Sequence, residues 1–171
     1  MLEEIWRRWT LWNLFRRVRR SGWTGVHVPG DAETASLSYS LGFWRSAQAP
    51  EIVFFGVDAH TANALLHAAY AQLTAGELAF ADKGSWTLEG EEGANIQLAW
   101  RKVHPSQIRR QHFNAAIIYN ERQGRGRSEL EAYQLFFPDT GGKFPWEDGF
   151  DTAYKPRQPE LYLPYFGPDR D

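Results

Sequence analysis

Four carboxylates gather in one short segment near the end of the chain, and they are the residues best placed to do chemistry. The segment is rich in glycine and aromatic residues, and its acids are Asp139, Glu147, Asp148 and Asp151. Carboxylates on such a loop can act as acid and base or hold a cation. Together with His104, Asp139 and Glu147 therefore define a candidate site for acid-base or metal-assisted hydrolysis.

A structural role explains the same segment more simply. In that interpretation Asp139 caps a turn, Phe144 and Trp146 fill the core, and the other acids face water. The ligand spacing of a calcium-binding loop is absent from the segment, so we favour the structural role.

The remaining polar residues lack the spacing of a metal or nucleotide site. His60 and His67 lie seven residues apart, which on a helix is about 10 Å along the axis and too far for one ion. His104 and His112 also miss the i, i+4 spacing of a helical metal pair, and the chain has no cysteine. It contains neither a phosphate-binding glycine loop nor a Gly-x-Ser-x-Gly motif. We therefore expect no metal and no cofactor.

Aromatic side chains form the second candidate surface, because rings make up 15% of the residues and ligand sites are commonly lined by them. We expect a ring-lined groove near Tyr39, Phe43, Trp44 and Trp146. Gln134 lies inside an apolar strand, where its amide must find hydrogen-bond partners either in the fold or in a ligand. We favour a structural hydrogen bond within the fold. It is expected to hold the loop from Asp139 to Trp146. The candidate ligand-binding residues are Tyr39, Phe43, Trp44, Gln134, Asp139, Trp146 and Glu147.

Alternating and continuous apolar runs predict the sheet that positions these residues. The segments 23–28 and 35–41 form a half-buried hairpin, in which leucines and a tyrosine alternate with serines,. A second hairpin surrounds the loop 90–94. The continuous apolar run 51–57 predicts a central strand covered on both faces, and 133–137 predicts a last buried strand.

Two core helices accompany the sheet. The segment 59–75 has apolar residues at helical spacing between an N-cap at Asp58 and a stop at Gly76. Pro105 suits the first turn of a second helix over 105–120. The fold class is therefore α+β, a single domain with a mainly antiparallel sheet of about five to six strands.

A further helix is expected at the N-terminus, from Leu2 to Arg20, because this segment has no Gly or Pro,. Its apolar stripe changes sides near Leu11. The first stripe comprises Leu2, Ile5, Trp6, Trp9 and Trp12, and the second comprises Leu11, Leu14, Phe15 and Val18. One stripe packs on the domain and the other needs a partner, so we predict a homodimer through this helix. Its arginines leave open a contact with a membrane or with nucleic acid.

Prolines predict an extended arm at the other end. From Lys155 onward they are Pro156, Pro159, Pro164 and Pro168, and they oppose regular structure. The organisation we predict is a helix over 1–21, one domain over 22–161 and an aromatic tail over 162–171.

Three stretches together resemble one known family. They are Ser38-Tyr-Ser-Leu-Gly-Phe43, Pro50-Glu-Ile-Val-Phe-Phe-Gly56, and Gln134-Leu-Phe-Phe-Pro-Asp139 running into Gly142-Lys-Phe-Pro-Trp-Glu147. Over about Gly22 to Leu161 the chain is similar to the domain of unknown function family numbered 4262, found chiefly in bacteria. The resemblance implies a single domain with no assigned reaction. The family commonly has a His before the Pro-Glu pair where this chain has Ala49, so no histidine role is carried over.

Composition limits the class of function. A chain of 171 residues is long enough for one domain with a sizeable core. Its 19 Lys and Arg against 21 Asp and Glu give no overall field that attracts nucleic acid, and no apolar stretch is long enough to span a membrane. The lack of cysteine favours a reducing compartment, the cytoplasm. We predict a small domain that binds a small molecule or a protein; the alternatives are the hydrolase and an adaptor that uses the basic helix on membranes or nucleic acid.

Overall fold

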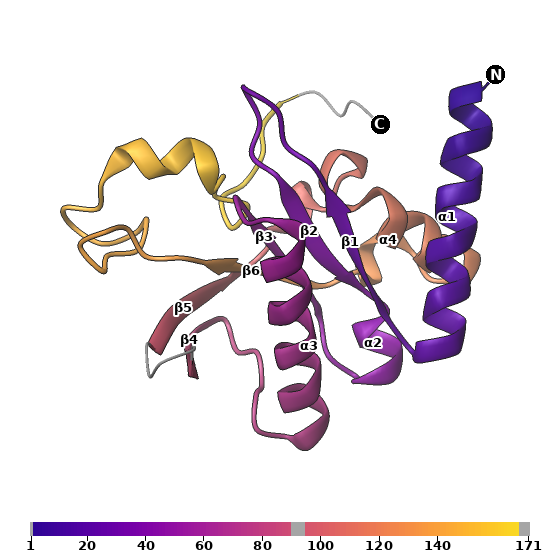
Figure 1. The fold of residues 1–171 in the computed structure, drawn as a ribbon, viewed down its shortest axis with the longest axis horizontal. Helices are drawn as coiled ribbons and strands as arrows, with labels where there is room; N and C mark the ends of the chain where they lie inside the picture. Colours follow the sequence, from indigo (N-terminus) through magenta and orange to yellow (C-terminus); the bar gives the residue numbers. More distant parts are fainter. Residues whose placement is uncertain (1, 90–94, 168–171) are drawn as a thin grey trace.

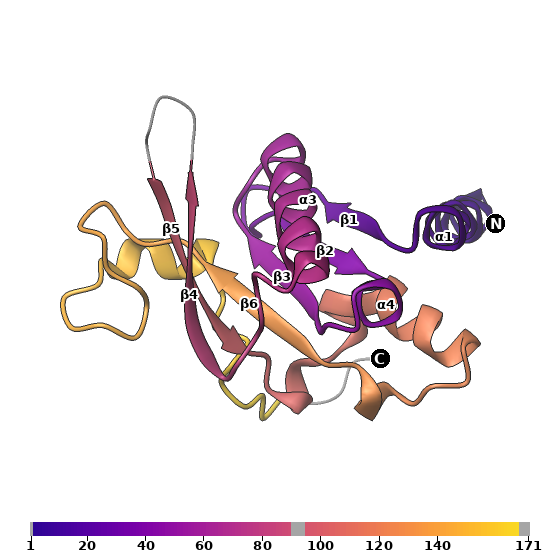
Figure 2. The same ribbon diagram turned by 90° about the horizontal axis from the view of Figure 1, so that it is seen from below.

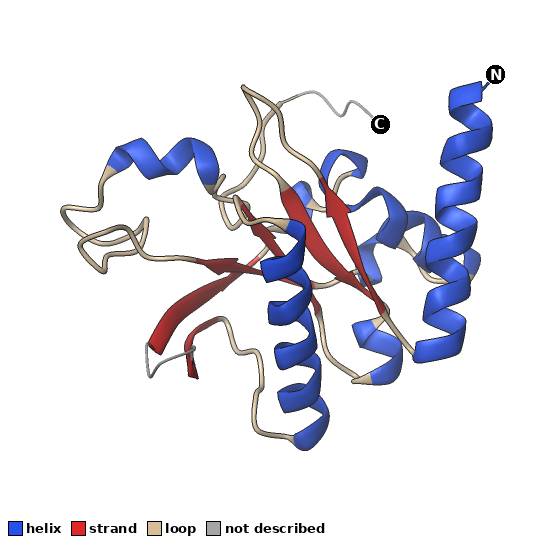
Figure 3. Cartoon of the chain, viewed as in Figure 1, coloured by secondary structure: helices blue, strands red, loops and turns tan. Residues whose placement is uncertain are grey.

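A six-stranded sheet organises the chain in the computed structural model, which describes residues 2–89 and 95–167 (Figures 1 and 3). The spatial order is β1-β2-β3-β6-β5-β4. The strands are β1 Thr24–Val28, β2 Leu37–Leu41, β3 Glu51–Phe55, β4 Lys83–Glu89, β5 Asn95–Lys102 and β6 Ala132–Phe136. Every neighbouring pair is antiparallel except β3 and β6, which are parallel. The predicted α+β class, the mainly antiparallel sheet and the central position of β3 are confirmed.

Helices cover both faces of the β1-β2-β3 half of the sheet, with α3 on one side and α4 on the other (Figure 2). The helices are α1 Leu2–Ser21, α2 Phe43–Ser46, α3 Ala59–Ala75 and α4 Arg110–Arg122. The α3 helix begins and ends as predicted. Asp58 accepts hydrogen bonds from the backbone N–H groups of His60 and Thr61, and Gly76 ends the helix with a φ of 74°, a conformation that glycine adopts readily.

The prediction of a half-buried first hairpin holds for β1, which has exposed and buried residues, but not for β2, all five residues of which are buried. The leucines and Tyr39 of β2 face the core under α1 and α4, and the serines lie on the face covered by α3. Ser38 and Ser40 remain satisfied there because their hydroxyls bond to His27 and Glu51.

The second core helix starts later than predicted. Pro105–Gln107 forms a separate 3-10 turn capped by the His104 side chain, and α4 begins only at Arg110. The tail is also not an extended arm. Thr152–Arg157 forms a 3-10 helix that contains Pro156, and Leu161 is buried in the main core. A 3-10 turn tolerates proline where a longer α-helix does not, because few backbone N–H groups are needed.

The two stripes of α1 have different environments. Phe15 and Val18 are buried against the domain, and Leu11 and Leu14 pack beside them. Trp9 and Trp12 are 57% and 49% exposed, while the predicted Leu2, Ile5 and Trp6 lie outside the residues whose side chains the structure describes. The second stripe is therefore the one that holds α1 on the domain.

Candidate functional site

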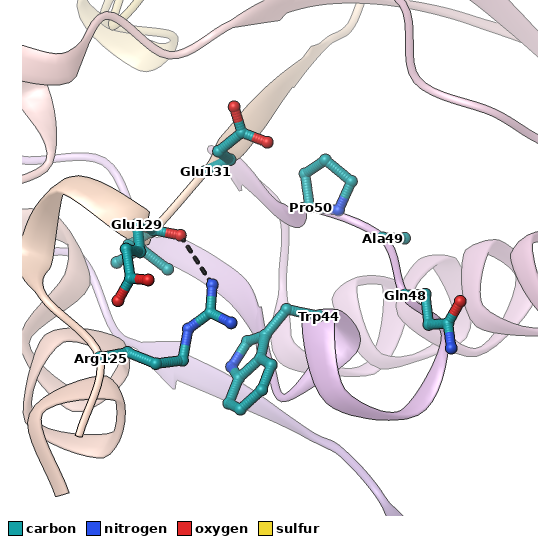
Figure 4. Close-up of a pocket in the computed structure, with 8 residues that line it drawn as sticks. Trp44, Gln48, Ala49, Pro50, Arg125, Glu129 and Glu131 are labelled. Carbon is teal, nitrogen blue, oxygen red and sulfur yellow. Dashed lines mark hydrogen bonds between the residues drawn. The ribbon is translucent and has the colours of Figure 1, made fainter. Parts of the chain in front are cut away.

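A pocket opens where the two parallel strands begin. β3 and β6 run side by side with Glu51 opposite Ala132. The segments that lead into the two strands therefore lie next to each other, at the end where both strands begin. The pocket has a volume of about 240 Å³, and Figure 4 shows the side chains around it. We call it the Trp44 pocket; it is lined by Trp44, Gln48, Ala49, Pro50, Arg125, Glu129, Leu130 and Glu131.

The wall of the pocket is a stacked pair, Trp44 from α2 and Arg125 from the loop after α4. The guanidinium carbon of Arg125 lies 4.2 Å from the centre of the Trp44 ring. A terminal nitrogen of Arg125 donates to the carbonyl oxygen of Glu129 at 3.0 Å (Figure 4). The indole Nε1 of Trp44 and the Nε of Arg125 are buried, and neither has a hydrogen-bond partner among the residues that the structure describes. Unpaired buried donors are rare in folded proteins, so this wall contains two N–H groups whose hydrogen bonds the described fold leaves unmade.

The segment that follows α2 in the lining of the pocket contains strained backbone. Gln48 has a φ of 52°, and it is the one residue other than glycine with a positive φ in the ranges that the structure describes. Holding a residue other than glycine in the left-handed, positive-φ region costs on the order of 1–3 kcal/mol of folding free energy. Such residues cluster at binding and catalytic sites. Ala49 follows Gln48, so the strained turn leads directly into the buried Ala49.

Two glutamates lie at the rim of the pocket. The carboxylate of Glu131 bonds to the ammonium of Lys102 at 2.6 Å, and Glu129 accepts the backbone N–H of Gly126 at 2.7 Å. Both side chains retain further lone pairs, because a carboxylate accepts about four hydrogen bonds. The pocket therefore combines N–H donors on its wall with acceptors on its rim.

A third glutamate, Glu51, lies fully buried at the start of β3. Its carboxylate accepts the hydroxyl of Ser40 and the backbone N–H of Gly42, the latter at 2.8 Å. The same hydroxyl oxygen accepts the backbone N–H of Ile52 at 2.9 Å. Burial raises the pKa of Glu51 to about 7, although these hydrogen bonds oppose the rise,. Glu51 thus ties α2, which carries Trp44, to β2 and β3.

The four rings expected to form one groove lie in three different clusters. Tyr39 belongs to the core under α1 and α4, and Phe43 belongs to the core under α3. Both are almost fully buried, and the Tyr39 hydroxyl accepts the backbone N–H of Ala115. Trp146 packs on Phe136 at the far end of the sheet. Of these rings Trp44 lines the pocket described above, and the sheet separates the others because alternate residues face opposite sides.

The acidic segment has the structural role that we favoured. One Asp139 oxygen accepts the backbone N–H groups of Gly141 and Lys143, and the other accepts that of Asp151 at 2.8 Å. Hydrogen bonding from Asp151 and Lys143 lowers the pKa of Asp139. These bonds hold Asp139 in its charged form as the centre of a turn, which leaves it poorly suited to give or take a proton at neutral pH.

The partners proposed for Asp139 are similarly engaged. Glu147 accepts the backbone N–H of Phe144 at 2.7 Å, and His104 bonds to Ser106 within its own turn. In the ranges 2–89 and 95–167 no hydrogen bond or ion pair joins His104 to either acid. No group of three or more histidine and acidic residues is placed to hold a metal ion in this described part of the chain.

Gln134 is fully buried and holds the tail, not the acidic loop as predicted. Its Nε2 donates to the carbonyl oxygen of Pro159 at 2.6 Å, and its Oε1 accepts the backbone N–H of Leu161 at 2.9 Å. The amide therefore makes a structural pair of hydrogen bonds to the chain that follows Thr152–Arg157.

Sequence reasoning missed several residues of the site, among them Gln48, Glu51 and Arg125 and the rim residues Glu129 and Glu131. Glu51 carried a usable signal, since a carboxylate at the head of a buried apolar strand must find partners or change its pKa. Gln48 and Arg125 carried none, because their importance depends on a backbone angle and on a contact between distant segments.

With the geometry described, comparison with known proteins identifies the chain as a single-domain member of an uncharacterised class. It belongs to the family Domain of unknown function (DUF4262), whose model matches residues 17–151. The match includes the last turn of α1, which we had placed outside the resemblance, and it includes every residue of the Trp44 pocket. No curated protein and no solved structure matches the chain. Among the helices in the described ranges, none combines the length and the apolar character needed to cross a membrane.

Proposed function

We propose that this protein is a small binding domain and that its ligand is held in the Trp44 pocket through an amide group. The observation that carries the proposal is the pair of buried N–H donors, Trp44 Nε1 and Arg125 Nε, that have no partner in the fold. A ligand oxygen placed between them would accept a hydrogen bond from each donor, and each such bond contributes about 1 kcal/mol or more to the free energy of binding. The cysteine-free composition supports a cytoplasmic location for this domain,.

The charges of the pocket favour a neutral amide over a carboxylate. Arg125 faces two rim glutamates, Glu129 and Glu131, so the lining residues carry more negative than positive charge. A carboxylate ligand meets like charge at the rim, whereas an amide offers its oxygen to the donors and its N–H groups to the glutamates. A volume of about 240 Å³ lies just below the range of about 300–1,000 Å³ typical of whole ligands. The pocket therefore suits one amide-bearing group of a small molecule or peptide.

The direct test is titration with benzamide, observed through the tryptophan indole N–H signals in a ¹⁵N–¹H spectrum. We expect the Trp44 signal, assigned with a Trp44→Phe variant, to move as its donor gains an acceptor. The indoles of Trp86 and Trp100 are internal controls, because they already donate to Gln72 and to the carbonyl oxygen of Ala81. Arg125→Lys, which removes the Nε donor, should weaken binding about tenfold, the equivalent of 1.4 kcal/mol.

Two results would contradict the amide proposal. In the first, benzoate moves the Trp44 signal as much as benzamide does. In the second, Arg125→Lys binds benzamide no more weakly than Arg110→Lys, a matched substitution at a residue paired with Glu121 on α4.

We also propose a homodimer formed through the exposed tryptophans of α1. Trp9 and Trp12 are 57% and 49% exposed, so a partner can cover both rings, and Trp12 also lines the cavity between α1 and α4. Burying two such rings stabilises association at about 25 cal/mol per Å² of apolar area. A two-fold dimer is the commonest arrangement that covers such a stripe.

Light scattering on Trp9→Ser tests the dimer. We expect the wild-type chain to have twice the mass of a monomer and the variant to shift toward the monomer. Ile96→Ser removes another exposed apolar side chain, 42% exposed on β5, and should leave the mass unchanged. A monomeric wild-type protein at high concentration would refute the dimer.

A further inference from the structure

A second cavity lies between α1 and α4, on the other side of α2 from the Trp44 pocket. Its volume is about 520 Å³, within the range of small-molecule sites. We call it the α1–α4 cleft; its principal lining residues are the arginines Arg19, Arg45 and Arg122 and the rings Trp12, Phe15 and Tyr119. Figures 1 and 2 show α1 lying beside α4 at the β1 edge of the sheet.

The arginines of the cleft lack a counter-ion among the residues that the structure describes. In the part of the chain that the structure describes, neither Arg19 nor Arg45 nor Arg122 forms an ion pair. No Asp or Glu is among the residues that line the cleft. Like charges brought together in one cavity repel, and an anion bound between them removes that cost.

Contacts within the fold orient two of the guanidinium groups. A terminal nitrogen of Arg45 donates to the Tyr119 hydroxyl at 2.9 Å. The guanidinium carbon of Arg122 lies 5.0 Å from the centre of the Phe15 ring. Phe15 and Tyr119 pack together at 5.2 Å, so both arginines rest on one rigid aromatic floor. A pre-oriented guanidinium loses less side-chain entropy when it binds an anion.

The cleft also offers an apolar surface next to these charges. The ring of Trp12 lines the cleft and is 49% exposed. Planar groups stack well on an indole. Guanidinium groups bind phosphate with strong, charge-assisted hydrogen bonds. Side chains alone can therefore supply the donors, without the backbone loop whose glycine motif the sequence lacks.

We propose that the α1–α4 cleft binds a phosphate monoester of a molecule that also carries a planar aromatic group. The arginines bind the phosphate, and Trp12 contacts the ring. This site and its ligand class are independent of the amide proposed for the Trp44 pocket. Trp12 and Phe15 precede the segment matched by the family model, so part of the wall that α1 contributes lies outside that segment.

Isothermal titration of the full chain tests the proposal with AMP and phenyl phosphate as probes, and with adenosine and inorganic phosphate as the separated halves of AMP. We expect at least one of the two phosphate monoesters to bind, and the tighter one identifies the size of ring that the cleft takes. Adenosine and inorganic phosphate should each bind at least about tenfold more weakly than the tighter probe. Binding of neither monoester, or of adenosine as tightly as AMP, would overturn the proposal.

Matched variants locate the binding. Arg122→Gln and Arg45→Gln should each weaken binding of the tighter probe about tenfold, because each removes one charge-assisted bond. Arg110→Gln makes the same change of charge on the same helix outside the cleft and should have less than a twofold effect. Circular dichroism checks that each variant is folded, and the exposed positions of Arg45 and Arg122 favour this. Equal weakening by all three variants would show non-specific attraction and refute a site in the cleft.

Discussion

Replacing Glu51 by Gln should remove about 3 kcal/mol of pH dependence from the free energy of unfolding. Burial raises the pKa of Glu51 to about 7 in the folded protein, from an ordinary value of 4.5. Between these two values the folded state holds a proton at Glu51 that the unfolded state has released. Stability from this group is therefore fully present below about pH 4.5 and is lost as pH rises to about 7. A rise of the pKa from 4.5 to about 7 changes the free energy of unfolding by roughly 3 kcal/mol, at about 1.36 kcal/mol per pKa unit.

The measurement is urea unfolding of the wild-type chain and of Glu51→Gln at several values between pH 4.5 and 8. The quantity to follow is the difference in unfolding free energy between the two proteins. This difference cancels other titrating groups, such as His112, whose pKa is lowered by burial and whose contribution therefore has the opposite slope,. We expect the wild-type chain to lose stability relative to the variant as pH rises, and the difference to level off above about pH 7.

Glu131→Gln is the matched control, because it makes the same substitution at an exposed carboxylate beside the same pocket. Surface substitutions change stability by about 0.5 kcal/mol or less, so its difference from the wild type should stay nearly constant over this range. A difference between the wild type and Glu51→Gln that is independent of pH would show that Glu51 is charged in the folded protein at pH 4.5 already.

This expectation also concerns the Trp44 pocket. The carboxyl group of Glu51 bonds to Ser40 on β2 and to the backbone of Gly42 at the start of α2. Trp44 lies two residues beyond Gly42, so the bonds made by Glu51 fix the short helix that positions the indole. The Glu51→Gln variant retains the shape of the side chain, and its amide can still accept the Gly42 N–H. Its benzamide binding should then remain measurable, which separates stability from binding.

Local signals in the sequence predict the parts of the fold that local interactions determine. The α3 helix is one case, since Asp58, the apolar spacing and Gly76 all lie within or beside the helix. The apolar run of β3 likewise predicts a central strand, because only a strand covered on both faces tolerates such a run. The turn centred on Asp139 also follows from nearby residues.

Features that depend on distant segments could not be predicted in the same way. The alternation of leucine and serine in β2 indicates one wet face, yet α3 covers that face and Glu51 supplies a partner for Ser40. The Trp44 pocket combines residues 44–50 with residues 125–131, and only the parallel pairing of β3 with β6 brings them together. The prediction of one groove lined by four rings was wrong for a related reason. The order of the strands decides which face of the sheet each ring lies on and how far apart the rings are.

The second large effect concerns Gln134, whose replacement by Leu should destabilise the protein by about 2–5 kcal/mol. The substitution removes the partners of the Pro159 carbonyl oxygen and the Leu161 N–H. Each group left unpaired in a buried place costs about 1–3 kcal/mol. For a chain of this length each kcal/mol lowers the melting temperature by roughly 2–4 °C, so we expect a fall of roughly 4–20 °C.

Because Gln134 bonds to the tail, we also expect its replacement to loosen the tail locally. Leu161 is buried in the main core, and its carbonyl oxygen accepts the backbone N–H of His104. Further along, the ring of Tyr165 lies 3.7 Å from the guanidinium carbon of the buried Arg109. Once the amide of Gln134 is gone, the tail should open more often than the sheet unfolds. Hydrogen exchange should then accelerate at the N–H groups of Leu161 and His104.

Gln97→Leu is the control for this substitution, because it makes the same change at an exposed position of the neighbouring strand β5. It should alter the melting temperature by no more than a degree or two. If Gln134→Leu melts at the same temperature as Gln97→Leu and its Leu161 N–H exchanges no faster, the tail is held by its other contacts and not by the Gln134 amide. Because Gln134 lies in the sheet and bonds to the tail, we expect a lower melting temperature and faster exchange at Leu161 together.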